Sequence, residues 1–125
     1  MTTDLHGKNT HDERELAAFI LEGAERRPEQ AFGDYYKGQT ASCALGAAYE
    51  AMYRLPRDAQ GRRPTRDLDW FFDCLDTVKP CPEHECRKRL SLAALLVHLN
   101  DDHVWTREHI AQWLVTTAPA VRTQA

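Results

Sequence analysis

The sequence predicts a mainly α protein, folded as a compact bundle of about five short helices. Apolar residues recur at helical spacing in separate segments, prolines and polar stretches divide these segments, and no pair of strands is evident. A chain of 125 residues is most simply one domain. We therefore expect a flexible arm over residues 1–11, a single helical domain over residues 12–118 and a tail over residues 119–125.

The first two helices are defined by apolar stripes and bounded by proline. The first begins at Asp12 and stops at Pro28, and residues 29–41 follow as a loop. Ser42 is placed to cap a second helix that ends near Leu55. The two apolar stripes are Leu16, Phe19, Ile20 and Ala24, and Ala44, Ala47, Ala48, Ala51 and Met52. The aromatic residues expected to be exposed in the loop are Tyr35 and Tyr36.

Three further helices follow residues 56–66, which we expect to be the most flexible segment. The fourth helix is capped by Ser91 and broken by Asn100-Asp101-Asp102, and the fifth is capped by Thr106. The apolar residues that define the three helices are Leu68, Phe71, Phe72 and Leu75; Leu92, Leu95, Leu96 and Leu99; and Ile110, Trp113 and Leu114. The aromatic residues expected in the core are Trp70, Phe71, Phe72, Trp105 and Trp113.

The chemistry of the chain is concentrated in one motif, C-x4-C-x11-H-x4-H, formed by Cys81, Cys86, His98 and His103. Two thiolates and two imidazoles in this order match a closed tetrahedral Zn²⁺ site. Such a site is structural, because it leaves no position for a substrate or an activated water. The prediction for residues 12–118 is therefore a zinc-binding domain, a helical bundle with a zinc knuckle. The remaining thiols, expected to be buried, are Cys43 and Cys74.

The ligand set depends on how the fourth helix ends. Residues five apart on a regular helix point about 140° apart, so His98 and His103 converge on one ion only if the helix ends between them. If it continues, both are ordinary polar residues at a helix end. His84, between the two cysteines, is the alternative ligand and is otherwise an exposed loop residue.

Residues 81–103 resemble the two-Cys, two-His zinc finger, because Leu90 and Leu95 lie between the two ligand pairs. In that family such an apolar pair packs the helix on the knuckle. The chain departs from the family pattern by one missing residue between the ligand pairs and by the lack of an aromatic ahead of the first cysteine. The helix positions that would meet DNA bases carry residues unable to make bidentate base contacts, namely Ser91, Ala93, Ala94 and Val97.

The bulk composition argues against several classes of partner. A net charge of −3 and a pI near 6.0 provide no overall attraction to nucleic acid or anionic lipid. No apolar run approaches the length of about 18 residues that a membrane span needs. The N-terminus has no apolar region of the kind found in secretory signals. We therefore expect a cytoplasmic protein with reduced cysteines and no membrane partner, of undetermined oligomeric state.

Two other groups of residues support alternative functions. Asp101, Asp102 and Glu108 lie near the ligands in sequence and would suit a small zinc-dependent hydrolase if one ligand were displaced. With four ligands available, helix capping is the better interpretation. Two basic clusters would suit weak nucleic-acid binding through phosphates, although short charged clusters are more often simply solvated. These clusters are Arg62, Arg63 and Arg66, and Arg87, Lys88 and Arg89.

Two stretches, 42–51 (SCALGAAYEA) and 98–114 (HLNDDHVWTREHIAQWL), resemble small uncharacterised proteins of bacteria and their phages. Those proteins carry a CALGA helix followed by an LND turn, and some have a CPxC-type knuckle at the place of Cys81 and Cys86. The resemblance implies that the two stretches pair in one domain, and it implies no activity. We expect a non-enzymatic, zinc-stabilised helical module that binds another macromolecule, in the first place a protein, as an accessory or phage-type regulator.

Overall fold

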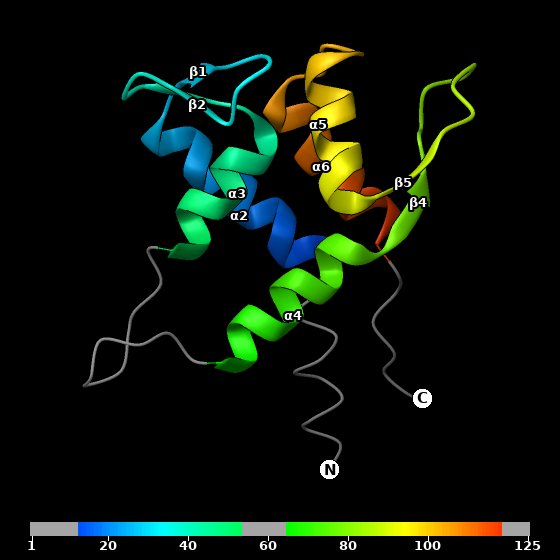
Figure 1. The fold of residues 1–125 in the computed structure, drawn as a ribbon, viewed down its shortest axis with the longest axis horizontal. Coiled ribbons are helices and arrows are strands. Elements are labelled where there is room, and N and C mark those ends of the chain that lie inside the picture. The colour runs from blue at the N-terminus through cyan, green and yellow to red at the C-terminus, as the bar shows by residue number, and fades with distance from the viewer. Residues whose placement is uncertain (1–12, 54–64, 119–125) are drawn as a thin grey trace.

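The computed structural model describes residues 13–53 and 65–118 of the chain. Within these ranges the protein has five helices and two small sheets, so the mainly α class is confirmed. The helices are α2 (Glu13–Arg26), α3 (Ala44–Tyr53), α4 (Thr65–Asp76), α5 (Leu92–Asp101) and α6 (Arg107–Thr117) (Figure 1). The predicted arm, the predicted tail and most of the predicted flexible segment lie outside the described residues.

Two of the predicted helix caps are confirmed by side-chain hydrogen bonds. The Ser91 hydroxyl accepts the amide N–H of Ala94 at 3.4 Å and begins α5. The Thr106 hydroxyl accepts the amide N–H of His109 at 3.0 Å and begins α6. Each bond satisfies one of the backbone donors that the first turn of a helix leaves without an intrahelical partner.

The start of α3 differs from the prediction, because Ser42 is a strand residue and not the cap. The helix begins at Ala44, and the Cys43 sulfur accepts the amide N–H of Gly46 at 3.3 Å. The side chain of Asn100, at the end of α5, accepts the amide N–H of Ala44 at 3.0 Å. The N-terminus of α3 is thus capped by a residue remote in the sequence.

The expectation that the chain has no strand pair is wrong, although the strands are only two or three residues long. β1 (Glu29–Gln30) pairs in parallel with β3 (Ala41–Ser42), and β2 (Tyr36–Lys37) pairs antiparallel with the other edge of β3. β4 (Val78–Pro80) and β5 (Arg89–Ser91) form an antiparallel hairpin. Strands this short cannot display the alternation of apolar and polar residues that reveals a strand in sequence.

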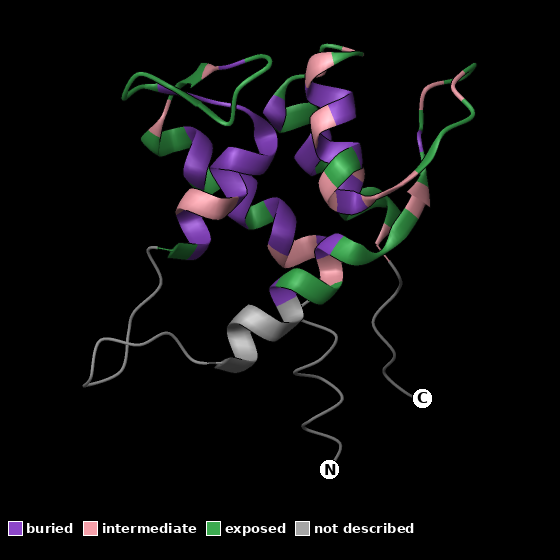
Figure 2. Cartoon of the chain, in the orientation of Figure 1, coloured by how far each residue is buried: buried purple, intermediate pink, exposed green. Residues whose placement is uncertain are grey.

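The core lies where α2, α3, α5 and α6 meet, and the buried faces of these helices turn toward one another (Figure 2). α2 packs mainly on α3 and α6, and α5 contacts α3, α4 and α6. Small residues let α2 and α3 approach closely, since a Cβ added to Gly23 would lie 2.0 Å from the carbonyl oxygen of Ala47.

The aromatic residues are distributed partly as predicted. Phe71 is fully buried, and Trp105 and Trp113 are half-buried against the core. Phe72 was predicted to be buried, but it is 42% exposed because α4 turns that face outward. Tyr35 and Tyr36 are exposed, as predicted. Among the described helices, none combines the length and apolar character that crossing a membrane requires.

Candidate metal centre

The β4–β5 hairpin holds the two cysteines at the two ends of its connecting loop. The Cys81 amide donates to the Lys88 carbonyl at 2.9 Å and extends the hairpin pairing past β4. The Cys86 amide donates to the Glu83 carbonyl at 3.1 Å, which folds the loop back on itself. Cys81 is buried and Cys86 is half-buried, so the pair sits at the boundary between the core and solvent.

The two histidines are brought together by the way α5 ends. The helix stops at Asp101, and the carbonyl of His98 accepts the amide of Asp102 at 2.9 Å and that of His103 at 3.2 Å. The Trp105 amide then donates to the Leu99 carbonyl at 2.9 Å. The condition set by helical geometry is therefore met, since the regular helix ends between His98 and His103.

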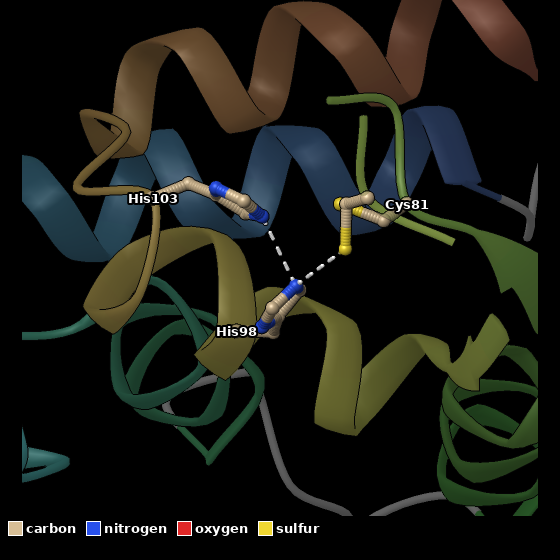
Figure 3. Close-up of side chains that lie close together, drawn as sticks. Cys81, His98 and His103 are labelled. Carbon is tan, nitrogen blue, oxygen red and sulfur yellow. Dashed lines mark hydrogen bonds between the residues drawn. The ribbon is translucent and has the colours of Figure 1, made fainter. Parts of the chain in front are cut away.

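The four predicted ligands converge on one point. One ligand atom from each of Cys81, Cys86, His98 and His103 lies within 4.8 Å of the other three. Figure 3 shows the rings of His98 and His103 turned toward each other and toward the sulfurs, with Cys81 entering from the hairpin. His84 is exposed and does not belong to this group.

The separations are close to those of a tetrahedral site. His98 Nε2 lies 3.1 Å from His103 Nε2 and 3.4 Å from the Cys86 sulfur. Zinc bonds of about 2.3 Å to sulfur and 2.0–2.1 Å to nitrogen, arranged tetrahedrally, place two nitrogens about 3.4 Å apart and a nitrogen and a sulfur about 3.6 Å apart. These two separations differ from the tetrahedral values by only a few tenths of an ångström.

Asp102 fixes the orientation and the tautomer of His98. Its Oδ2 lies 2.7 Å from His98 Nδ1, so the carboxylate accepts the Nδ1–H and leaves the Nε2 lone pair facing the other ligands. A carboxylate behind a metal-binding histidine is a common outer-shell arrangement, which raises the basicity of the ring. Sequence analysis placed Asp102 near the ligands but did not assign it this role. Its position four residues after a ligand on a helix was the available signal.

The electrostatics of the cluster favour a thiolate. The backbone N–H of Lys88, assisted by the His103 and His98 side chains, lowers the pKa of Cys86 to about 6. Burial lowers the pKa of His98, but hydrogen bonds to Cys86 and Asp102 outweigh it and raise that pKa overall. Burial raises the pKa of the Cys81 thiol. One sulfur donor is thus ionised at neutral pH before any metal arrives.

Asp101, the second carboxylate next to the predicted ligands, stabilises the fold through hydrogen bonds. Asp101 Oδ1 accepts the amide N–H of Gly33 at 3.1 Å and a side-chain N–H of Asn100 at 2.8 Å. Glu83 accepts the indole N–H of Trp105 and so ties the cysteine loop to the chain just after His103. Asn100, Asp101 and Asp102, predicted as helix breakers, each make a specific contact.

The cluster has one interior side and one open side. Cys81 and His98 are buried, whereas Cys86 and His103 are half-buried and line an open pocket together with Glu83, His84 and Glu85. Arg87, Lys88 and Arg89 are exposed on the hairpin just beyond this pocket. The other predicted basic cluster falls on residues whose side chains the structure does not describe.

Comparison with known proteins adds no relative: no family model, no curated protein and no solved structure matches this chain. The assignment of the site therefore rests on the geometry of the four side chains and on the chemistry of their donor atoms.

Proposed function

We propose that this chain is a non-enzymatic helical module, stabilised by one Zn²⁺ ion, that acts by binding another protein as an accessory or phage-type regulator. Cys81, Cys86, His98 and His103 would hold the ion. The observation that carries the zinc assignment is the convergence of two sulfur and two imidazole donors within 4.8 Å, with Asp102 bonded behind His98. A set of two thiolates and two imidazoles suits Zn²⁺, and a closed set of four protein ligands is typical of structural sites.

The order of elements around the cluster supports the same proposal. A two-stranded hairpin carrying the cysteines is followed by a helix carrying the first histidine, as in the ββα unit of two-Cys, two-His zinc fingers. Leu95 is fully buried and Leu90 packs against the core, consistent with an apolar pair that holds the helix on the hairpin. His103 lies past the end of α5, which lets its ring meet that of His98 although the two residues are five apart.

The exposed aromatic residues favour a protein partner. Tyr35, Tyr49 and Tyr53 form a continuous row, with ring centroids 6.0 Å and 6.2 Å apart. Tyr35 and Tyr53 at its ends are 48% and 46% exposed. Aromatic side chains are enriched at protein interfaces, where they bury large areas at a small cost in conformational entropy.

The two alternatives receive less support from the site. A hydrolase needs an open metal position, and four protein ligands would leave none. Of the carboxylates next to the ligands in sequence, Asp102 is bonded to His98 and Asp101 to Gly33. Nucleic-acid binding would depend on exposed arginine and lysine residues against a net charge of −3.

Elemental analysis of protein purified without added metal tests the zinc assignment. We expect one zinc per chain, lost when Cys81 and Cys86 are both replaced by Ser. The matched control is Cys74→Ser, a thiol outside the cluster, which should retain the metal. Absence of bound zinc, or undiminished zinc in the double variant, would refute the proposal.

Co-purification from the native cell tests the partner. A protein partner should be retained by the parent chain and lost on Tyr35→Ala combined with Tyr53→Ala, while the zinc content stays unchanged. Sequence-specific binding to duplex DNA of nanomolar strength at physiological salt would instead favour nucleic-acid recognition.

A further inference from the structure

The turn that carries His103 also makes hydrogen bonds to a loop from an earlier part of the chain. This loop, residues 30–43, links β1 to the start of α3 and exposes Phe32, Tyr35 and Tyr36. The turn, residues 98–105, contains two of the ligands and connects α5 to α6. The conformation of the turn therefore affects both the loop 30–43 and the positions of His98 and His103.

The first half of the turn makes four hydrogen bonds to the loop and its flanks. Asn100, which is fully buried, accepts from the Gln30 side chain at 2.8 Å and from the Ala44 amide at 3.0 Å. It donates to the Ala31 carbonyl at 2.9 Å. Asp101 accepts from the Gly33 amide at 3.1 Å. Three of the four hydrogen bonds of the Asn100 side chain thus go to the loop and its flank, and the fourth goes to Asp101.

The second half of the turn makes a separate connection. The Gln30 side chain donates to the Trp105 carbonyl at 2.7 Å and accepts from the Arg107 amide at 3.3 Å. The Trp105 indole donates to Glu83, which lies between Cys81 and Cys86. The loop is therefore bonded to residues before His103 and to residues after it. Through Trp105, the second of these connections also reaches Glu83 in the cysteine hairpin.

Val104, between His103 and Trp105, has a strained backbone conformation. Its φ of 56° lies in the left-handed region, which β-branched residues strongly disfavour. Val104 is 63% exposed, so packing does not hold it there. The restraints on it are the neighbouring contacts of Trp105 and, in the metal-bound protein, the ligation of His103. Ligation of His103 would add a restraint directly beside this strained residue.

We propose that metal binding at the Cys81–His103 cluster orders the aromatic loop 30–43 through the turn 98–105, so that the presentation of Phe32, Tyr35 and Tyr36 depends on the metal. This inference rests on the proposed metal site and adds a regulatory role to it. The turn is the two-state element that both sites bias, which is the physical requirement for coupling between them. Gly33 and Gly38, both at positive φ, allow the released loop to change conformation.

Hydrogen exchange of metal-loaded and chelated protein tests the coupling. The informative amides are those of Ala31 and Cys43, which donate within the loop, to Ser42 and Tyr35. We expect their exchange to accelerate about tenfold or more on metal removal, within the usual range for coupled sites. The amides of Leu16–Ala24 in α2 should keep their protection.

A pair of variants at Asp101 separates the hydrogen bond from the charge. In Asp101→Ala the loop amides of the metal-loaded protein should exchange at the rate of the chelated parent. In Asp101→Asn, which keeps an acceptor for Gly33 but removes the charge, protection should be restored. Because coupling is reciprocal, Asp101→Ala should also weaken zinc affinity by the same factor, measured against a competing chelator.

The outcomes distinguish this inference from the proposed site. If the protein binds no metal, both are refuted. If it binds metal but the Ala31 and Cys43 amides exchange equally with and without it, the coupling alone is refuted. Equal loss of protection in α2 on metal removal would also refute the local path, as would parent-like behaviour of Asp101→Ala.

Discussion

Replacing Asp102 by Ala should weaken metal binding without removing a ligand. The carboxylate of Asp102 lies 2.7 Å from His98 Nδ1 and fixes the ring with Nε2 toward the metal position. In the variant, the ring would sample both tautomers and other orientations, and the metal would have to select the competent one. The donor set of two sulfurs and two nitrogens would remain.

The magnitude follows from the position of the carboxylate. Loss of an outer-shell partner of a metal ligand costs about 10- to 100-fold in affinity. The Asp102 side chain is 66% exposed, so water takes over part of its role and screens its charge. We therefore expect the lower end of the range, about tenfold, which corresponds to about 1.4 kcal/mol.

Competition with a chromophoric chelator at neutral pH measures this difference. The matched control is Glu85→Gln, which removes one negative charge from the pocket beside the cluster, where Glu85 is exposed. Asp102→Ala should lose clearly more affinity than Glu85→Gln. If the two variants behave alike, the carboxylate acts only as a nearby charge and the proposed orientation of His98 is incorrect.

Four further results are expected. Arg107→Ala should lower the free energy of unfolding in urea by about 3 kcal/mol, because its buried guanidinium donates to the carbonyls of Arg27 and Pro28, just past the end of α2, at 2.6 Å and 2.8 Å. A loss below about 1 kcal/mol would contradict this. Val104→Gly should raise the free energy of unfolding by about 0.5–1 kcal/mol, because glycine adopts the left-handed backbone at this position without strain. A lower free energy of unfolding in this variant would argue against strain at Val104. The pKa of Cys86 is lowered to about 6 from 9.0, so in the metal-free protein the stabilisation from its thiolate is complete above pH 9.0 and is lost as the pH falls through about 6. Zinc affinity should fall over the same acid range, because the thiolate is the form that binds the metal. A zinc affinity that does not change with acid pH would exclude Cys86 as a ligand. Chelation should expose the amides of the β4–β5 hairpin and of the turn after α5 to exchange while α2 stays protected, because a chain of this size does not need a metal for its core. Uniform loss of protection would show that the metal holds the whole domain.

The helices and the ligand set could be predicted because both follow from local spacing. The apolar stripes of α2, α5 and α6 and the hydroxyl caps at Ser91 and Thr106 lie within a few residues of the structure they specify. The four side chains that converge were predicted from the pattern of cysteines and histidines, and the break in α5 between the histidines was expected from Asn100-Asp101-Asp102.

What could not be predicted depends on contacts between distant segments. The cap that begins α3 comes from Asn100, and the buried Arg107 binds the carbonyls of Arg27 and Pro28. Neither contact has a local periodicity that would reveal it. The strands were missed because two or three residues carry no alternation, and their pairing is fixed by the loops and helices around them.

The pairing of the CALGA and LND stretches has a physical basis in the structure. Asn100, in the second stretch, caps the helix that Ala44 begins in the first. Asp101 holds Gly33, in the loop leading to that helix. The two stretches are thus joined by direct hydrogen bonds, and the second of them also carries His103.

X-ray absorption at the zinc edge tests the central claim most directly. For protein loaded with one equivalent of zinc, we expect a four-coordinate ion with two sulfur neighbours at about 2.3 Å and two imidazole nitrogens at about 2.0–2.1 Å. His84→Ala should leave this spectrum unchanged, whereas His103→Ala should replace one imidazole nitrogen with an oxygen ligand. A parent spectrum with fewer than two sulfurs, or one that changes with His84 and not with His103, would contradict the site described here.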